Sequence, residues 1–272
     1  MKVVVLGSTG MLGRYVFSYL RKSLNVIKLD RDTLNAEFIS ENILQNLFKK
    51  NNIQKGDVII NCVGIIKQRN DISNLEYVRV NSEFPLILAN VCEKKEIQLI
   101  HITTDCVFNG FNGNYDENSV HNPEDLYGKT KSIGEPTNCT VIRTSIIGEE
   151  LKSGVSLIEW IKSNANKKVN GFTNHFWNGI TCLQFAKICE KIINENLFWE
   201  GVRHIYSPNS VTKGQLVQIV SDIYNLNIKV NLIEVFPKCN RTLNSIYPII
   251  FKLEEIVYQI KEQKEFYENL IK

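Results

Sequence analysis

Residues 3–13 read VVVLGSTGMLG, an unbroken apolar run followed by a turn that holds three glycines. Four consecutive apolar residues are typical of a parallel strand that is covered on both faces. Gly7, Gly10 and Gly13 stand where the strand would pass into a helix, and a glycine turn there lets backbone N–H groups approach a pyrophosphate. Their GxxGxxG spacing is a variant of GxGxxG, so its weight comes from its place after a strand. The stretch predicts the start of a dinucleotide-binding fold.

The same alternation of apolar runs and amphipathic stretches continues through the first half of the chain. We expect strands at residues 3–6, 26–29, 57–63, 98–104 and 140–143, and helices at about 11–24, 38–49, 80–93 and 126–135. Strands that alternate with helices in this way are typical of βαβ units. The predicted fold is therefore α/β, with a Rossmann-type, doubly wound parallel sheet.

After Gly148 the alternation weakens, and helical segments mix with short strands. This change predicts a smaller substrate-binding domain interleaved with the first one. We expect the NAD(P)-binding domain to comprise residues 1–148 and about 179–207, and the substrate-binding domain to comprise about 149–178 and 208–272.

Composition excludes several classes of protein. The 272 residues are 43% hydrophobic and 22% charged, which is typical of a globular chain with one or two domains. A net charge of +3 is too small for the electrostatic attraction on which nucleic-acid binding depends. No apolar run is long enough for a membrane span. The seven scattered cysteines never form C-x-x-C, and the four histidines lack ligand spacing. We therefore expect a cytoplasmic protein with reduced thiols, no metal and no membrane or nucleic-acid partner.

Asp30 and Arg31 follow the second predicted strand and point to a nicotinamide cofactor in two different ways. An acidic residue about 20 positions after the glycines can accept a hydrogen bond from the adenosine ribose. A guanidinium at the same place can pair with a 2′-phosphate. The pair leaves both cofactors open, and we expect NADP(H) to be favoured and NAD(H) to be accepted.

Tyr127 and Lys131 are four residues apart, so a helix would place both on one face. A neighbouring ammonium favours phenolate and would lower the pKa of Tyr127, which fits a proton donor. Thr103, Thr104 and Asp105 end a predicted parallel strand, at the sheet edge where open α/β folds bind ligands. Thr104 would supply a second hydrogen bond to the same substrate oxygen.

Five ordered motifs extend this interpretation: GSTGMLG at 7–13, TTDCVFNG at 103–110, NYDEN at 114–118, YGKTKSIGE at 127–135 and RTS at 143–145. Together they resemble the extended short-chain dehydrogenase/reductases, specifically the dTDP-4-dehydrorhamnose reductase family. The resemblance implies an NAD(P)-dependent oxidoreductase that reduces the 4-keto group of a nucleotide-linked deoxysugar, in the biosynthesis of activated sugars for surface glycans. It also allows a homodimer.

Carried over by position, the resemblance assigns catalysis to Thr104, Tyr127 and Lys131. The residues expected at the cofactor are Gly7, Gly10, Met11, Leu12, Asp30, Arg31, Asn35, Asn61, Val63, Gly64, Thr103, Tyr127 and Lys131. The residues expected at the substrate are Lys67, Thr104, Asp105, Val107, Trp177, Asn178 and Arg241.

Three departures from the family pattern fall where the substrate should bind. Cys106 replaces an aromatic residue, Ile146 replaces a Trp, and residues 175–181 replace a Gln-x-Gly-x-Pro-Thr motif. They predict a related 4-keto sugar, either dTDP-4-dehydrorhamnose-like or a UDP-linked, N-acetylated 4-keto-6-deoxyhexose.

Two alternatives stay open. A nucleotide-sugar epimerase or 4,6-dehydratase of the same superfamily shares the glycine turn and the Tyr/Lys pair, although the dehydratases carry Asp-Glu where this chain has Asp105-Cys106. A non-catalytic NADP-binding regulatory subunit, such as the β subunit of methionine adenosyltransferase, retains much of the same motif set.

Overall fold

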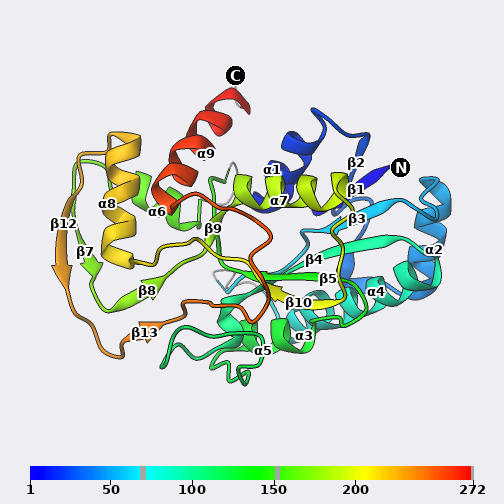
Figure 1. Ribbon diagram of the computed structural model, residues 1–272, viewed down its shortest axis with the longest axis horizontal. Helices are drawn as coiled ribbons and strands as arrows, with labels where there is room; N and C mark the ends of the chain where they lie inside the picture. The colour runs from blue at the N-terminus through cyan, green and yellow to red at the C-terminus, as the bar shows by residue number, and fades with distance from the viewer. Residues whose placement is uncertain (68–71, 151–153, 271–272) are drawn as a thin grey trace.

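A six-stranded parallel sheet forms the centre of the computed structural model, which describes residues 1–67, 72–150 and 154–270 (Figure 1). The strands stand in the order β10-β5-β4-β3-β1-β2. Their bounds are β1 (Val3–Leu6), β2 (Val26–Leu29), β3 (Val58–Asn61), β4 (Gln98–Thr104), β5 (Thr140–Thr144) and β10 (Gly201–His204). The order reverses direction at β1, as in a doubly wound sheet, and the predicted fold class is confirmed.

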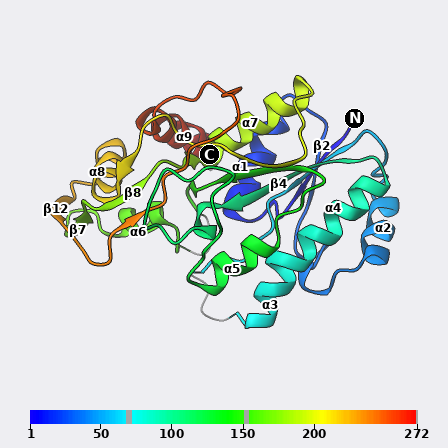
Figure 2. The ribbon, with the colours of Figure 1, turned by 60° about the horizontal axis from the view of Figure 1, so that its bottom comes forward.

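Helices cover both faces of this sheet because the strands are apolar on both sides. Val3 and Val5 pack with α1 (Met11–Leu20) and α7 (Cys182–Asn194). Val4 and Leu6 face the other way, towards α2 (Glu41–Lys50) and α4 (Phe84–Lys94). Figure 2 shows α2, α3 (Asn74–Val78), α4 and α5 (Leu126–Ile133) on one side of the sheet, with α1 and α7 on the other.

The second part of the chain forms smaller sheets around a third apolar cluster. Its elements are β6 (Ile146–Ile147), α6 (Leu157–Ser163), β7 (Lys168–Phe172), β8 (His175–Trp177), β9 (Ile180–Thr181), β11 (Val211–Thr212), α8 (Lys213–Tyr224), β12 (Lys229–Ile233), β13 (Cys239–Asn240) and α9 (Ile256–Leu270). α9 contributes to two clusters, since Tyr267 packs in the cluster of α1 and α7, and Ile260 packs in the third cluster. It therefore bridges the two predicted domains, whose exact bounds stay a prediction.

The helix predicted at 80–93 begins earlier than expected. Ser73 and Glu76 form a capping box that starts α3, and a π-helical turn over Arg79–Glu83 joins α3 to α4. The apolar spacing alone did not reveal this wider turn.

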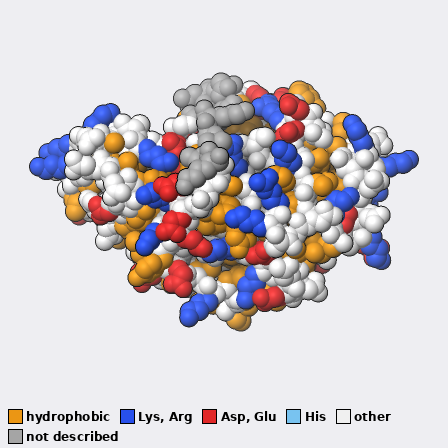
Figure 3. All heavy atoms as spheres, turned by 90° about the horizontal axis from the view of Figure 1, so that it is seen from above, with side chains coloured by type: hydrophobic (Ala, Val, Ile, Leu, Met, Phe, Trp, Pro, Cys, Tyr) orange, Lys and Arg blue, Asp and Glu red, His pale blue; other side chains and the backbone are white. Residues whose placement is uncertain are grey.

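Surface charge of both signs is spread over the molecule. On the face in Figure 3, Lys and Arg side chains alternate with Asp and Glu side chains around small apolar areas. Among the described residues, no helix is both long and apolar enough to cross a membrane.

A buried carboxylate connects the two parts of the chain. Glu149 accepts hydrogen bonds from Tyr15 of α1, from Tyr224 of α8 and, at 3.1 Å, from the Gln263 side chain of α9. Three donors from three helices satisfy a charge that would otherwise be costly to bury.

Arg143 of β5 is the centre of a second buried polar cluster. Its guanidinium donates to the Glu135 carboxylate, with Nε 3.0 Å from Oε1, and contacts His204 Nε2 and His121 Nε2 at 2.8 Å each. Because a guanidinium can only donate, both imidazole nitrogens must accept, and both rings must be neutral. The pKa of His204 is lowered to about 4 and that of His121 is also lowered, in both cases first by burial and then by the charge of Arg143.

This cluster predicts a loss of stability in mild acid. Unfolded histidine has a pKa of about 6.5, so the stabilisation is complete above that pH and is lost as pH falls through about 4. For His204 alone the free energy of unfolding should fall by about 3 kcal/mol over this range. Urea unfolding of the wild type and of His204→Gln between pH 4 and 8 measures this fall in the free energy of unfolding.

The matched control is His175→Gln, because the His175 ring makes one hydrogen bond to the described residues, at the Pro237 carbonyl. The control should keep the wild-type pH dependence, whereas His204→Gln should be less stable at neutral pH and flatter in acid. Identical slopes in all three proteins would contradict the assignment to His204.

Candidate functional site

A cleft of about 820 Å³ lies at the carboxyl edge of the sheet. One wall comes from the ends of β1, β3 and β4 and from α5, and the other comes from β8, the start of α8 and the segment around Arg241. Open α/β sheets bind ligands at this edge.

The glycine turn forms the floor of the cleft at β1. Gly7 has φ +72°, and a Cβ atom on it would lie 3.1 Å from the backbone of Cys62. A Cβ atom on Gly13 would lie 2.2 Å from the Gly7 carbonyl oxygen, so Gly13 lets α1 press against the turn. Gly10 caps α1 without a side-chain hydrogen bond, and the first turn holds no acidic residue. The helix therefore presents N–H groups that fit a phosphate.

Asp30, Arg31 and Asn35, predicted at the cofactor, line the same cleft. One oxygen of Asp30 is engaged by its own turn, since Thr33 donates to Oδ1 from its backbone at 3.2 Å and from its hydroxyl at 3.1 Å. Asn35 accepts from the backbone of Glu37 at 3.1 Å. Arg31 is exposed and makes no ion pair with any described residue. Its guanidinium is therefore available to an anionic ligand.

The three predicted catalytic residues meet in the middle of the cleft. Thr104 ends β4, while Tyr127 and Lys131 lie one turn apart on α5. Asp125 caps α5 by accepting from the Gly128 backbone at 2.7 Å. A Cβ atom on Gly128 would lie 2.3 Å from the Cys106 carbonyl oxygen, so glycine is required for α5 to approach the end of β4. This contact brings Tyr127 within hydrogen-bonding reach of Thr104.

We expected a lowered pKa for Tyr127, whereas its pKa is raised in the enclosed site. Burial raises the pKa of Tyr127, Cys106 and Asp105 add to the rise, and the hydrogen bond from Thr104 opposes it. Lys131 instead donates to the Ile102 carbonyl at 2.9 Å. Burial lowers the pKa of Lys131 to about 8. The enclosed site thus disfavours both charged forms.

Four of the predicted substrate residues other than Thr104 line the cleft: Lys67, Asp105, Trp177 and Arg241. Lys67 Nζ lies 3.9 Å from Asp125 Oδ2 at the rim. Arg241 is anchored by its Nε, which donates to the Phe108 carbonyl at 2.8 Å. Burial raises the pKa of Asp105, against the positive charges of Arg241 and Lys213.

Three predicted site residues do not line the cleft, and the structure corrects them. Val107 is fully buried in a side cluster with Phe108. Asn178 is occupied by the Leu243 backbone, which donates to its Oδ1 and accepts from its Nδ2, both at 2.9 Å. Asn61, expected at the cofactor, turns its side chain back into the fold. The side chains of Asn61 and Asn178 make hydrogen bonds inside the protein, as buried polar groups require. Val107 packs among apolar side chains.

Asn61 has a clear structural role. Its Oδ1 accepts from the backbone of Val63 at 3.0 Å, and its Nδ2 contacts His101 Nδ1 at 3.0 Å. The bond to Val63 shapes the loop after β3. Val63 and Gly64 of that loop line the cleft, together with Thr103, Met11 and Leu12.

Lys213 lines the cleft and was not predicted. Lys213 begins α8, and its ammonium lies 5.5 Å from the centroid of the Trp177 ring. Burial lowers its pKa, and the negative charge of Asp105 opposes the shift. A lysine at the start of an amphipathic helix carries no sequence signal, so only the fold reveals its place in the cleft.

Asn81 was not predicted either; it lies outside the lining of the cleft and holds the loop after β3 against α5. Its Oδ1 accepts from the Ile65 backbone and its Nδ2 donates to the Ile65 carbonyl, both at 2.9 Å. Nδ2 also lies 3.4 Å from the Thr130 hydroxyl. The π-helical turn over Arg79–Glu83 carries this side chain into the interior.

Replacing Asn81 by Ala should therefore loosen the cofactor wall. It removes both partners of the Ile65 backbone, and each unpaired buried group costs about 1–3 kcal/mol. We expect the free energy of unfolding to fall by about 2–4 kcal/mol and NADPH binding to weaken. Urea unfolding and a fluorescence titration measure these effects.

Asn90→Ala on the exposed side of α4 is the matched control and should change neither quantity. Wild-type stability and NADPH affinity in Asn81→Ala would contradict the role of Asn81 in holding the loop after β3.

Comparison with protein families gives a match to the RmlD substrate binding domain over residues 1–227. Relatives of different kinds are similar in sequence. The β subunit of methionine adenosyltransferase 2 from Xenopus laevis is 26% identical over 250 residues, covering 83% of this chain and 72% of the relative. The dTDP-4-keto-6-deoxy-D-glucose reductase of Streptomyces niveus is 30% identical over 154 residues, covering 52% and 51%.

Solved structures share the fold. A dTDP-4-dehydrorhamnose reductase from Clostridium acetobutylicum superposes with a TM-score of 0.79 at 19% identity, covering 98% of this chain and 100% of the other. The corresponding Bacillus anthracis protein, solved in complex with NADP, gives 0.80 at 16% identity, covering 98% and 99%.

Proposed function

The chain belongs to the family of the RmlD substrate binding domain, as the ordered motifs predicted, and we propose that it is an NAD(P)H-dependent reductase of a nucleotide-linked 4-keto sugar. The observation that carries the proposal is the meeting of Thr104, Tyr127 and Lys131 in one cleft with the glycine turn. The relative from Streptomyces niveus is named as a reductase of such a sugar.

The residues of the turn fit a dinucleotide. The start of α1, which has no side-chain cap, would face the pyrophosphate, and Arg31 suits a 2′-phosphate at the adenosine end. NADP(H) is therefore favoured, and Asp30 is compatible with NAD(H). A similar fold from Bacillus anthracis was solved with NADP, which supports this preference.

The proposed chemistry uses the polar groups of the three central residues. When bound, the nicotinamide supplies the hydride for the sugar C4 carbonyl. Tyr127 donates its proton to the C4 oxygen, and Thr104 donates a second hydrogen bond to the same oxygen. The raised pKa of Tyr127 keeps the phenol protonated before the reaction. Lys131 holds the ribose hydroxyls and offers a positive charge to the phenolate that remains.

The sugar half of the cleft supports an anionic, nucleotide-linked substrate. Lys213 and Arg241 bring two positive charges to the wall opposite the glycine turn, where they would meet a diphosphate. Cys106 gives the sugar subsite more space than an aromatic residue would. We propose a dTDP- or UDP-linked 4-keto-6-deoxyhexose, an N-acetylated one included.

Turnover on a panel of sugars tests the proposal. Purified protein should consume NADPH with one of dTDP-4-keto-6-deoxyglucose, dTDP-4-dehydrorhamnose or UDP-linked N-acetylated 4-keto-6-deoxyhexose, as followed by NADPH absorbance. Tyr127→Phe should lower kcat by about 10² or more, the usual contribution of a general acid, and leave NADPH affinity nearly unchanged.

Tyr258→Phe on the exposed side of α9 is the control and should keep full activity. If the protein binds NADPH but reduces none of the sugars, the reductase proposal fails. Co-purification with another enzyme would then favour a regulatory subunit, the class to which the Xenopus laevis relative belongs by name.

The lowered pKa of Lys131 predicts that cofactor binding depends on pH. Its pKa of about 8 means that the ammonium is lost as pH rises through that value, so NADPH affinity should fall on the alkaline side. Titrations between pH 6.5 and 9.5 measure the step. Lys131→Gln should bind weakly without a step, whereas Lys129→Gln, an exposed neighbour on α5, should match the wild type. A step of equal size in Lys131→Gln would assign it to another group.

A further inference from the structure

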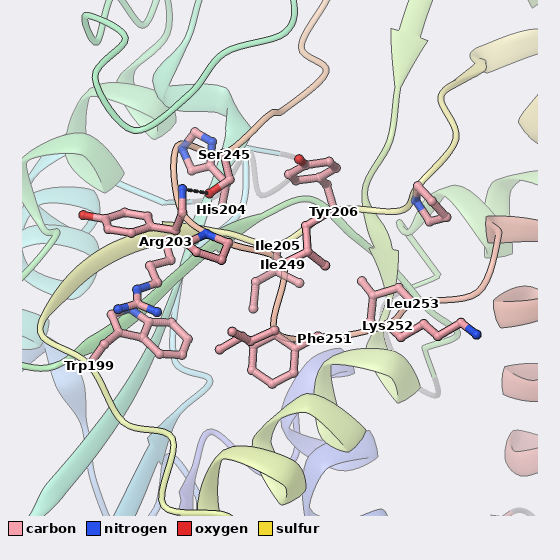
Figure 4. A pocket seen from close by; sticks show the side chains of 14 residues that line it. Trp199, Arg203, His204, Ile205, Tyr206, Ser245, Ile249, Phe251, Lys252 and Leu253 are labelled. Carbon is pink, nitrogen blue, oxygen red and sulfur yellow. Dashed lines mark hydrogen bonds between the residues drawn. The ribbon is translucent and has the colours of Figure 1, made fainter.

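A second cavity, of about 260 Å³, lies between β10 and the segment 245–253 that runs towards α9 (Figure 4). It shares no lining residue with the cleft at the carboxyl edge of the sheet. The proposed reduction does not use it.

The walls of this cavity are mostly apolar. Figure 4 shows Ile205, Ile249, Phe251 and Leu253 around the space, with Trp199 at one end. The charged residues that line it are Arg203 and Lys252, and the described lining holds no Asp or Glu. The cavity therefore combines apolar surface with positive charge.

Most polar groups of the wall are already engaged within the protein. The Tyr206 hydroxyl donates to Asn244 Oδ1 at 3.0 Å, and the Ser245 hydroxyl donates to Glu117 Oε1 at 2.7 Å. His204 is held by Arg143 and by the Asn244 carbonyl. These groups shape the wall and have little capacity left for a ligand.

Arg203 is the exception. Its Nε is buried and has no hydrogen-bond partner among the described residues. The guanidinium carbon lies 4.9 Å from the ring centroid of Trp199 and 4.7 Å from that of Tyr247. Aromatic rings hold a guanidinium through its face, which leaves its in-plane N–H groups for an anion such as a carboxylate.

We propose that this cavity is a binding site for a small aromatic carboxylate, with the ring among the apolar walls and the carboxylate on Arg203. Size supports a ring with a substituent, since a cavity of about 150 Å³ accommodates benzene and this one is larger. Charge supports an anion, because the half-buried Arg203 makes no ion pair with a described residue and a carboxylate is the best-matched partner of a guanidinium.

Isothermal titration with naphthalene-2-carboxylate and with its neutral amide tests the site, using the full chain saturated with NADPH and UDP to occupy the cleft. The carboxylate should bind saturably and more tightly than the amide. Arg203→Gln should weaken carboxylate binding by about tenfold or more and leave amide binding nearly unchanged, because only the charged contact is lost.

Two further variants keep the result independent of folding. Arg21→Gln is the matched control, since the Arg21 guanidinium also lies over a ring, that of Phe17 at 5.5 Å, but on the exposed surface. It should bind like the wild type. Ile249→Asp changes a side chain that is 80% exposed and should weaken the carboxylate by repulsion.

Equal binding of carboxylate and amide, or unchanged carboxylate binding in Arg203→Gln, would overturn the proposal. So would the absence of saturable binding of the carboxylate to the wild type. None of these outcomes affects the reductase proposal, because the cleft and this cavity have separate walls.

Discussion

Close approach of helices to the carboxyl edge of the sheet is the constraint on which the site depends. Glycine permits it at each contact: at Gly13 a Cβ atom would lie 2.2 Å from the Gly7 carbonyl oxygen, and at Gly128 it would lie 2.3 Å from that of Cys106. At Gly134 it would lie 1.9 Å from the Asn81 carbonyl oxygen. Any side chain would push α1 or α5 outwards, and the glycine turn and the Tyr/Lys pair would move with them.

The same close packing determines the electrostatics. Once α5 presses against β4, Tyr127 and Lys131 lose water, so burial shifts both pKa values towards the neutral forms. A neutral phenol is ready to give a proton, while a lysine with a pKa near 8 still carries its charge for much of the time at neutral pH. The enclosed geometry thus supports general acid catalysis without a preformed phenolate.

The sequence predicted what local pattern and chain order determine. Unbroken apolar runs indicated the parallel strands, and the glycines after β1 together with Tyr127 and Lys131 on one helix face indicated the cleft. Val107, by contrast, sits beside Thr104 in the chain, yet the turn after β4 directs its side chain into the core. Adjacency in sequence does not fix the direction of a side chain.

Partners distant in sequence could not be predicted in this way. Asn178 is held by the backbone of Leu243, which is 65 residues away. Lys213 reaches the cleft only because α8 begins beside Trp177. Asn81 acts through a π-helical turn that the apolar spacing does not register. Each depends on tertiary packing, which overrides local preference.

One buried carboxylate, that of Glu149, connects the two halves of the cleft. α1 presents its amino terminus to the cofactor side, and α8 presents Lys213, its first residue, to the substrate side. Further along these helices, Tyr15 and Tyr224 both donate to Glu149, which itself lines the cleft. A buried carboxylate with these donors resists separation, because parting them would leave a charge unpaired in the interior. In the proposed reaction, Glu149 would therefore help to set the distance between hydride donor and sugar without touching Tyr127 or Lys131.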